Sequence, residues 1–449
     1  MKRGDEIEVD VVGLDPKGDG RGIVDEREII VRRAVPGDKI KGRVIKKRRA
    51  RADVEITDYI DYGMPRKEAQ CIHFGLCGGC RWQDLSYEDQ LLLKEHMVRN
   101  ALREYGFHDV KVRPTTPSHS PFFYRNKMEY SFGCDRDGNV RLGLHVRGKF
   151  NRIFDVESCQ LQSPLSNKIV QNVRRLANEL DLSAYNLKNH SGLLRFLVIR
   201  DAKKSNQVLV NLFVSNYPEN GVEKLVNRLR EEISEIDSLI ITLHRGKAQV
   251  AKGEKEFVLW GDGAIEESCG PIRLDISPQS FFQTNSLQAE LLYNLIADWA
   301  GEEIGETLDL YCGTGSISLY LADRAEYVLG IEVVEEAVVD ARSNAERNGI
   351  KNCSFVVGKA EDELVSIRDR DFNLVVVDPP RPGLHKNVLA ALGQMKPPRI
   401  LYVSCNPQTL AENAYVLRDY GYDIGRVQPV DMFPQTPHCE VVCEMEQLY

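Results

Sequence analysis

The sequence predicts a multidomain protein with a small all-β barrel, an α+β central domain and an α/β Rossmann-like domain. Its 449 residues exceed one ordinary domain, for which roughly 150 residues is typical. Short β-branched runs separated by turn residues fill the first 60 residues, and mixed strands and helices follow. From about residue 276, apolar strands alternate with helices, which is typical of a mostly parallel sheet. We therefore expect domains at 1–60, 61–275 and 276–449.

The N-terminal region carries a concentrated positive charge. Residues 39–52, KIKGRVIKKRRARA, include eight basic and no acidic residues, although the whole chain has a net charge of −8. A small OB-like barrel with a basic rim can follow a phosphate backbone, because Lys and Arg displace the counterions condensed on nucleic acid. The alternative is a charged strand edge that only faces solvent. The segment therefore predicts a local RNA contact.

The composition excludes several classes of protein. No segment approaches the roughly 18 consecutive apolar residues of a membrane span, and the N-terminal MKRGDE leads into no apolar secretory segment. The eleven cysteines are expected to serve metal binding or catalysis as reduced thiols, because disulfides are rare in the cytosol. We expect a cytoplasmic protein without a membrane partner, and no protein partner is evident.

The central region shows periodic elements but little chemistry. Residues 86–105 predict an amphipathic helix that ends before Gly106, and residues 165–180 predict another. The apolar stripe expected on the first helix consists of Leu91, Leu92, Met97, Val98, Ala101 and Leu102. Strand-like runs lie at 195–201, 206–215 and 238–246.

Two strand ends in the last domain predict a nucleotide-like ligand. The run LDLYCGTGS puts Gly313 and Gly315 in a tight turn that opens a helix, where the backbone can approach a ligand closely. The next strand ends at Glu332, whose carboxylate can accept hydrogen bonds from both hydroxyls of a ribose. The loop GTGSIS lacks the third glycine of the dinucleotide fingerprint, so we favour S-adenosylmethionine over NAD.

The following strands add a carboxylate and a thiol at the same edge. Asp378 ends the run VVVDPPR, for which a simple strand-terminating turn is the alternative, and Cys405 ends the run YVSCNP. A thiolate there suits covalent catalysis, because its attack on carbon 6 of uracil makes carbon 5 nucleophilic. The hydrogen on carbon 5 must then leave to a base. Glu440 is our candidate, and His438 is its rival.

These motifs occur together in one order along the chain. The set FFQ at 281–283, DLYCG at 309–313, GIE at 330–332, DPPR at 378–381, SCNP at 404–407 and DMFP at 431–434 resembles the RNA uracil-5 methyltransferase family. Residues 1–60 resemble a TRAM domain, an RNA-binding barrel. The resemblance covers nearly the whole chain and is weakest over residues 160–275.

The resemblance implies a role for individual residues. Cys405 is the implied nucleophile and Glu440 the implied base. The residues implied to contact S-adenosylmethionine are Gln283, Tyr311, Ser316, Glu332 and Asp378. Two positions depart from the family pattern, since many members have Asn at the place of Ser316 and a β-branched apolar residue at the place of Cys439. The first departure leaves that cofactor contact open.

The base that is methylated can also be argued from the motif around Asp378. In the related 5-methylcytosine RNA methyltransferases a cysteine follows the Asp-Pro-Pro motif, whereas Arg381 follows it here. Adenine-N6 enzymes need an aromatic residue at that position. We therefore expect uridine as the target.

Three cysteines within ten residues predict a metal centre. Cys71, Cys77 and Cys80 surround a pair of glycines, and spacing alone leaves a structural zinc site with His73 as a ligand open. The family resemblance adds Cys159 as the fourth ligand and implies a [4Fe-4S] cluster. No Cys-x3-Cys-x2-Cys motif of radical enzymes is present, so we expect a cluster that has a structural or RNA-ordering role.

The sequence thus predicts an enzyme that forms 5-methyluridine in structured RNA. The basic barrel and the cysteine cluster favour 23S ribosomal RNA, with the T-loop of transfer RNA as the alternative. A non-catalytic RNA-binding iron-sulfur protein and a small-molecule methyltransferase are rivals from other classes. The strand-end motifs argue against the first rival, and the basic barrel argues against the second.

Overall fold

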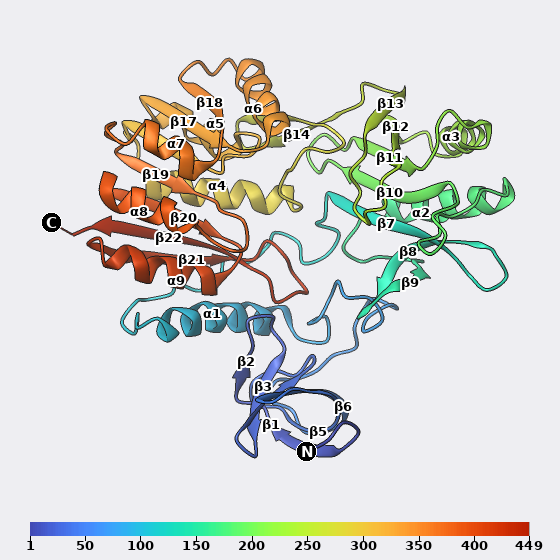
Figure 1. Cartoon of the computed structure of the whole chain (residues 1–449), viewed down its shortest axis with the longest axis horizontal. Helices are drawn as coiled ribbons and strands as arrows, with labels where there is room; N and C mark the ends of the chain where they lie inside the picture. Colours follow the sequence, from blue (N-terminus) through green and yellow to red (C-terminus); the bar gives the residue numbers. More distant parts are fainter. Residues whose placement is uncertain (449) are drawn as a thin grey trace. The chain divides into compact units, whose positions relative to one another are not determined.

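The computed structural model describes residues 1–448, which divide into two compact units (Figure 1). Unit 1 comprises Met1–Gln70, Gly79–Ser118 and the chain from Val376 onward, and unit 2 comprises Cys71–Gly78 and His119–Val375. Each unit therefore joins segments that are remote in sequence. The division into three domains remains a prediction.

The N-terminal part of unit 1 is a six-stranded sheet folded around its own core. Its strands are β1 (Glu6–Asp10), β2 (Gly13–Leu14), β3 (Gly20–Val24), β4 (Arg27–Val31), β5 (Lys39–Lys47) and β6 (Arg51–Asp61), in the order β1-β5-β6-β4-β3-β2. Along β5, Ile40 and Val44 are buried, while Lys41 and Arg43 are exposed. This alternation follows from the two-residue period of a strand, and it places the basic side chains of β5 outside the core.

Helix α1 (Tyr87–Glu104) confirms the predicted helix, but its buried face differs from the expected stripe. The Ser86 hydroxyl caps the helix by accepting a hydrogen bond from the Asp89 N–H at 3.0 Å. Leu92, expected in the stripe, is 48% exposed, whereas Gln90 and Lys94 are fully buried. The expected stripe was partly wrong: it included Leu92 and left out the fully buried Leu93, and it also left out these two polar side chains, which have buried partners in unit 1.

The rest of unit 1 is an α/β layer. It contains α8 (Lys386–Met395), β20 (Arg399–Ser404), α9 (Pro407–Arg418), β21 (Tyr422–Val430) and β22 (Glu440–Gln447). The strands follow the order β19-β20-β22-β21, in which β19 (Leu374–Val377) is shared with unit 2, and β22 runs antiparallel to both neighbours. Helix α1 runs alongside α9 (Figure 1) and packs against it.

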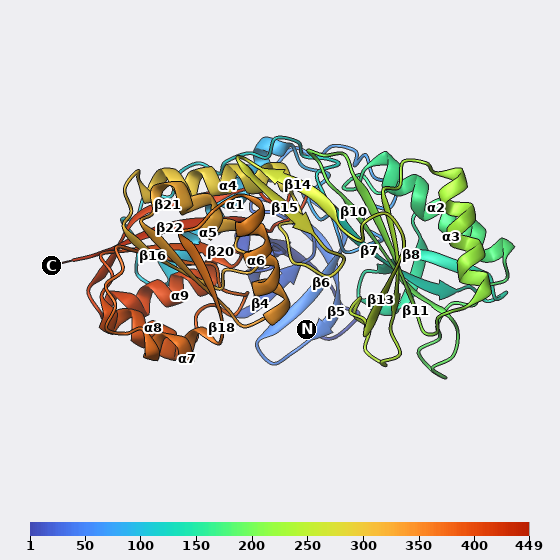
Figure 2. The same ribbon diagram turned by 90° about the horizontal axis from the view of Figure 1, so that it is seen from above.

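The larger sheet of unit 2 has two helices on one face. Its strands are β7 (Lys127–Cys134), β8 (Val140–Val146), β9 (Lys149–Asp155), β10 (Leu194–Asp201), β11 (Val208–Val214), β12 (Ser238–Leu243) and β13 (Lys255–Trp260), in the order β13-β12-β11-β10-β7-β8-β9. Helices α2 (Pro164–Glu179) and α3 (Asn220–Glu232) lie side by side (Figure 2) and share one apolar core with this sheet. The predicted strands and the predicted helix of this region are confirmed.

The α/β part of unit 2 confirms the alternation of strands and helices. Its elements are β14 (Ile265–Cys269), β15 (Ile272–Ile276), α4 (Ser286–Ala300), β16 (Glu306–Leu310), α5 (Ser316–Leu321), the 3-10 turn η1 (Ala322–Arg324), β17 (Tyr327–Glu332), α6 (Glu335–Arg347), β18 (Cys353–Val357) and α7 (Ala360–Ser366). Strands β18, β17 and β16 are parallel neighbours, so their carboxyl ends meet at one edge. Among residues 1–448, no helix is both long and apolar enough to cross a membrane.

Candidate active site

The turn after β16 forces the backbone into left-handed conformations. Tyr311, Gly313 and Gly315 have φ values of +65°, +54° and +79°. A non-glycine residue in this region is strained, and such strain concentrates at functional sites. The N–H of Tyr311 donates to the carbonyl of Ile331 at 2.9 Å, which ties the turn to the end of β17.

The carboxylate of Glu332 is oriented by the same turn. It accepts hydrogen bonds from the N–H of Gly313 at 3.1 Å and from the N–H of Val334 at 2.9 Å. The structure therefore brings Tyr311 and Glu332 together at adjacent strand ends, with Ser316 as the first residue of the helix that follows. This is the arrangement that a ribose-binding carboxylate beside a glycine turn requires.

The two glycine positions at this edge are enforced by close packing. A Cβ atom added to Gly315 would lie 2.9 Å from the ring of Phe355, and one added to Gly330 would lie 2.6 Å from the same ring. Behind the turn, the Ser318 hydroxyl donates to the fully buried carboxylate of Asp309. Burial raises the pKa of Asp309 to about 7, and the neighbouring charge of Glu332 adds to the shift.

Gly315→Ala is expected to lower the free energy of unfolding by more than Gly349→Ala. Both glycines have positive φ, so each substitution costs about 1–2 kcal/mol of backbone strain. A Cβ at Gly349 meets nothing within 4 Å, whereas at Gly315 it meets Phe355 and Ala341 and adds about 1–3 kcal/mol of overpacking. Denaturation midpoints of the two variants test this, and equal losses would contradict it.

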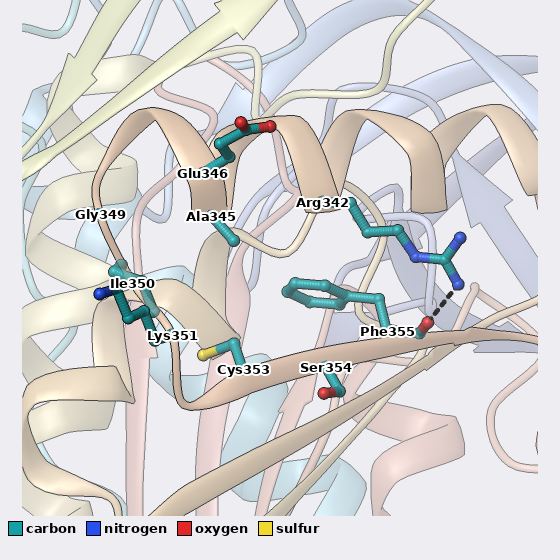
Figure 3. A pocket seen from close by; sticks show the side chains of 9 residues that line it. All are labelled: Arg342, Ala345, Glu346, Gly349, Ile350, Lys351, Cys353, Ser354 and Phe355. Carbon is teal, nitrogen blue, oxygen red and sulfur yellow. Dashed lines mark hydrogen bonds between the residues drawn. The ribbon is translucent and has the colours of Figure 1, made fainter.

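A pocket of about 590 Å³ lies on the other side of Phe355, between α6 and β18 (Figure 3). The guanidinium of Arg342 donates to the carbonyl of Phe355 at 2.6 Å across it. None of the predicted site residues lines this pocket. Its walls are the edge strand and the end of a helix, so it is separate from the strand ends that carry the site residues.

Gln283 belongs to a segment that is held by the central sheet of unit 2. The side-chain amide of Asn126, just before β7, donates to the Gln283 carbonyl at 2.8 Å and to the Ser286 hydroxyl at 2.7 Å. The guanidinium of the buried Arg200, on β10, donates to the carbonyls of Pro278 and Ser280. Burial lowers the pKa of Arg200 to about 10. Sequence reasoning missed both anchors, because their polar partners are remote in the chain.

Cys405 lies between β20 and α9, in a turn that is closed by side chains. The Ser404 hydroxyl accepts from the Asn406 N–H at 3.1 Å, and the Asn406 side chain caps α9 by accepting from the Gln408 N–H at 3.2 Å. The Asn406 amide also donates to the Arg381 carbonyl at 3.1 Å. These contacts fix the Cys405 turn against the loop that contains Asp378, within unit 1.

The β20–β22 register puts Cys405 and Glu440 at the same end of this strand pair. Ser404 pairs with Val441 at the end of the β20–β22 ladder, so the next residues beyond this rung are Cys405 and Glu440. Cys405 directly follows the last residue of β20, and Glu440 acts electrostatically on its thiol. Glu440 is also paired with Val430 on β21 and is only 4% exposed. The register therefore brings the predicted nucleophile and the predicted base together.

Burial and neighbouring carboxylates shift the acidity of this pair. Burial raises the pKa of Cys405 to about 11, with a further increase from Glu440 and an opposing effect from Arg381. Burial also raises the pKa of Glu440 well above its usual value, and Asp378 adds to that increase. Arg381 stabilises the charged forms of both groups. Sequence reasoning used Arg381 only to exclude cytosine and did not assign it this effect.

The structure shows interactions among only three of the four predicted cysteine ligands. In unit 2, burial raises the pKa of both Cys71 and Cys159, and the two thiols and Cys77 influence one another electrostatically. In unit 1, the Gln83 amide donates to the Cys80 sulfur at 3.3 Å. Within residues 1–448, no group of three or more His, Cys, Asp or Glu residues is arranged to hold a metal ion.

One ring nitrogen of His73 is engaged in a hydrogen bond, which leaves Nδ1 for the zinc alternative. Its Nε2 accepts a hydrogen bond from the Glu157 N–H at 3.1 Å, so that nitrogen already has a partner. Burial lowers the pKa of His73 and so favours the neutral ring, which is the form that binds a metal.

Comparison with known proteins places this geometry in a defined class. The sequence pattern of the family described as tRNA (uracil-5-)-methyltransferase matches residues 86–447. An RNA methyltransferase of Caldanaerobacter subterraneus subsp. tengcongensis is 37% identical over 100% of both chains. One of Clostridium acetobutylicum is 35% identical over 98% of this chain and 97% of its own. Both relatives are described as uncharacterized.

A solved structure extends the similarity to three dimensions. The tRNA (uracil-54, C5)-methyltransferase of Pyrococcus abyssi, in complex with S-adenosyl-L-homocysteine, superposes with a TM-score of 0.77 at 29% identity. It covers 98% of this chain and 100% of its own. The protein is therefore an RNA methyltransferase. More particularly, the chain belongs to the tRNA (uracil-5-)-methyltransferase family, as its motifs indicated.

Proposed function

We propose that this enzyme transfers a methyl group from S-adenosylmethionine to carbon 5 of a uridine in structured RNA, with Cys405 as the covalent nucleophile and Glu440 as the base. The observation that supports the proposal is the β20–β22 register, by which these two residues are the next ones beyond the last paired rung, Ser404 with Val441. The family supports methylation of uracil in RNA, and the complex of the Pyrococcus abyssi relative with S-adenosyl-L-homocysteine supports the cofactor.

We assign cofactor contacts to Gln283, Tyr311, Ser316, Glu332 and Asp378. The Glu332 carboxylate is held by two backbone N–H groups and would accept hydrogen bonds from the ribose hydroxyls. The strained Tyr311 and the two glycines would let the backbone approach the adenosyl group. When bound, S-adenosylmethionine supplies an electrophilic methyl group on a sulfonium.

The first half of the reaction needs Cys405 as a thiolate. Its sulfur adds to carbon 6 of the uracil, and the electron pair of the 5,6 double bond moves to make an enolate through oxygen 4. Carbon 5 then bonds to the methyl carbon while the bond from that carbon to the sulfonium breaks. The Arg381 guanidinium favours the thiolate, because it lowers the pKa of Cys405 against the effect of burial.

The second half needs Glu440 as a carboxylate. It removes the hydrogen from carbon 5, the electron pair re-forms the 5,6 double bond, and the bond between carbon 6 and the Cys405 sulfur breaks. The thiolate is thereby regenerated. Because sulfur attacks the face of the ring, the uridine has to leave the base stack, which costs a few kcal/mol. Phosphate contacts of the basic β5–β6 region would offset that cost.

The enzyme is expected to become more active as the pH rises from 7 to 9. With a pKa of about 11, the Cys405 thiol is mostly protonated in this range, and its thiolate fraction increases about tenfold per pH unit. The measurement is kcat/KM for RNA against pH, and a flat profile over these two units would contradict the expectation.

We propose 23S ribosomal RNA as the substrate and the cytoplasm as the location. The basic TRAM-like region of residues 1–60 and the cysteine cluster favour ribosomal RNA. The alternative, the T-loop of transfer RNA, gains support from the name of the Pyrococcus abyssi relative. Mass spectrometry of 5-methyluridine in separated ribosomal and transfer RNA from a deletion strain tests both. Unchanged 5-methyluridine in all RNA would contradict the proposed function.

We propose further that Cys71, Cys77, Cys80 and Cys159 bind a [4Fe-4S] cluster with a structural role. The mutual electrostatic influence of three of these thiols supports it, since thiolates that lie near one another are stabilised by a bound cation. Protein purified without oxygen is expected to be brown, with about four irons per chain. Cys159→Ala should lose most of this iron, and Cys134→Ala should keep it. Stoichiometric zinc without iron would overturn the assignment.

A further inference from the structure

A buried ion pair joins α1 to the segment that precedes Glu440. The ammonium of Lys94 and the carboxylate of Asp431 are both 0% exposed and form a direct salt bridge. Lys94 also donates to the Phe433 carbonyl at 3.1 Å, and the Tyr87 hydroxyl donates to Asp431 at 2.9 Å. A buried charge is costly unless it is paired and hydrogen-bonded. Both charges here are paired, so α1 and this segment are held in one arrangement.

A second contact lies one helical turn earlier on α1. The Gln90 amide donates to the side-chain oxygen of Gln435 at 3.0 Å, and the Gln435 N–H donates back to the Gln90 oxygen at 2.9 Å. Gln90 also donates to the Trp82 carbonyl at 2.9 Å. Residues four apart lie on the same face of a helix. Gln90 and Lys94 therefore hold the middle and the start of the same segment.

This segment, residues 431–439, is a loop closed at both ends. Val430 and Glu440, the residues that flank it, pair with each other across β21 and β22. Inside the loop, the Thr436 hydroxyl donates to the Phe433 carbonyl at 2.7 Å and accepts from the His438 N–H at 3.2 Å. Glu440 is the first residue of β22 and directly follows this loop. A shift of the loop relative to α1 would therefore move Glu440.

We propose that Lys94 and Gln90 are positioning residues, which hold the 431–439 loop so that the Glu440 carboxylate reaches the hydrogen on carbon 5 of the covalent intermediate. This inference rests on the proposed function. It concerns the release step, because the turn that contains Cys405 is held separately, by the side chains of Ser404 and Asn406 at the junction of β20 and α9. Removal of either side chain should therefore slow proton removal more than nucleophilic addition.

The test separates these two steps in single turnovers. RNA with tritium on carbon 5 of uridine is mixed with S-adenosylmethionine and excess enzyme. Covalent enzyme–RNA adduct reports addition, and tritium released to water reports proton removal. The variants are Lys94→Met combined with Asp431→Asn, which removes both buried charges, and Gln90→Leu, which leaves no buried charge unpaired. The control is Arg66→Met, which breaks a partly buried ion pair elsewhere in unit 1, Arg66 with Asp38.

Tritium release is expected to fall about tenfold or more in both variants, because small displacements of a catalytic group have effects of this order, while adduct formation changes less than about threefold. Arg66→Met should change the two rates equally or not at all. Equal losses of addition and release in the Lys94 and Gln90 variants, or the same selective loss in Arg66→Met, would overturn the inference. If the double variant fails to fold, Gln90→Leu decides the outcome.

The failure of this inference differs from the failure of the proposed function. If Glu440→Gln releases tritium at the normal rate, Glu440 is not the base, and that part of the proposed function fails. If Glu440→Gln fails to release tritium while the Lys94 and Gln90 variants release it at the normal rate, only the positioning role is wrong.

Discussion

Cys405→Ala is expected to abolish methylation of RNA, with a loss of about 10⁴-fold or more, while binding of S-adenosylmethionine is retained. Removal of a covalent nucleophile has effects of this size in enzymes whose chemistry depends on it. Cofactor binding should persist, because the contacts assigned to it are made by other residues. Incorporation of labelled methyl groups into RNA and a binding titration with S-adenosylmethionine measure the two effects.

The control for this variant is Cys134→Ala, in which an exposed thiol of β7 is removed. It should retain full activity. Substantial turnover by Cys405→Ala would exclude covalent catalysis by this residue. Loss of cofactor binding together with activity would show that the substitution disturbs the strand end as a whole.

Glu440→Gln is expected to trap the enzyme on its substrate. The amide keeps the size of the side chain but cannot accept the proton from carbon 5, so the methylated adduct with Cys405 cannot collapse. We expect turnover to fall about 10²–10⁴-fold, the usual contribution of a general base, while a covalent enzyme–RNA band accumulates under denaturing conditions. Mass spectrometry of the trapped fragment should show a methylated uracil bound to Cys405.

Two variants make this result specific. Glu446→Gln changes an exposed carboxylate on the same strand and should turn over normally without adduct. Cys405→Ala combined with Glu440→Gln should form no adduct. An adduct in that double variant would mean that another residue is the nucleophile, and normal turnover by Glu440→Gln would assign the base to another group, with His438 as the first candidate.

The strand-end motifs show what local sequence could predict. Gly313 and Gly315 predicted a tight turn, and the structure shows it in left-handed conformations. The hydrogen bond from the Gly313 N–H to the Glu332 carboxylate was not predicted. The helix that starts after Ser86 was also predicted, because its cap and its periodicity are encoded within a few residues.

Lys94 shows what local sequence could not predict. A lysine next to an apolar stripe is normally assigned to the solvent face, and its burial depends on Asp431, which lies 337 residues later in the chain. The signal was that Gln90 and Lys94 are four residues apart. That spacing puts both side chains on one face of the helix, but it predicts their burial only when a buried polar partner is known for each of them.

The sequence by itself determined the alternation of strands and helices, the turn at Gly313 and Gly315, and the family of the protein, because these depend on local backbone preferences and on motifs. Only the tertiary structure decided that Glu440 and Cys405 lie at the same end of neighbouring strands, since that follows from the register of β20 and β22. It also decided that early and late segments of the chain share one compact unit. Strand register and the burial of charge depend on contacts between segments that are remote in the chain. They therefore cannot be predicted from any single segment of the sequence.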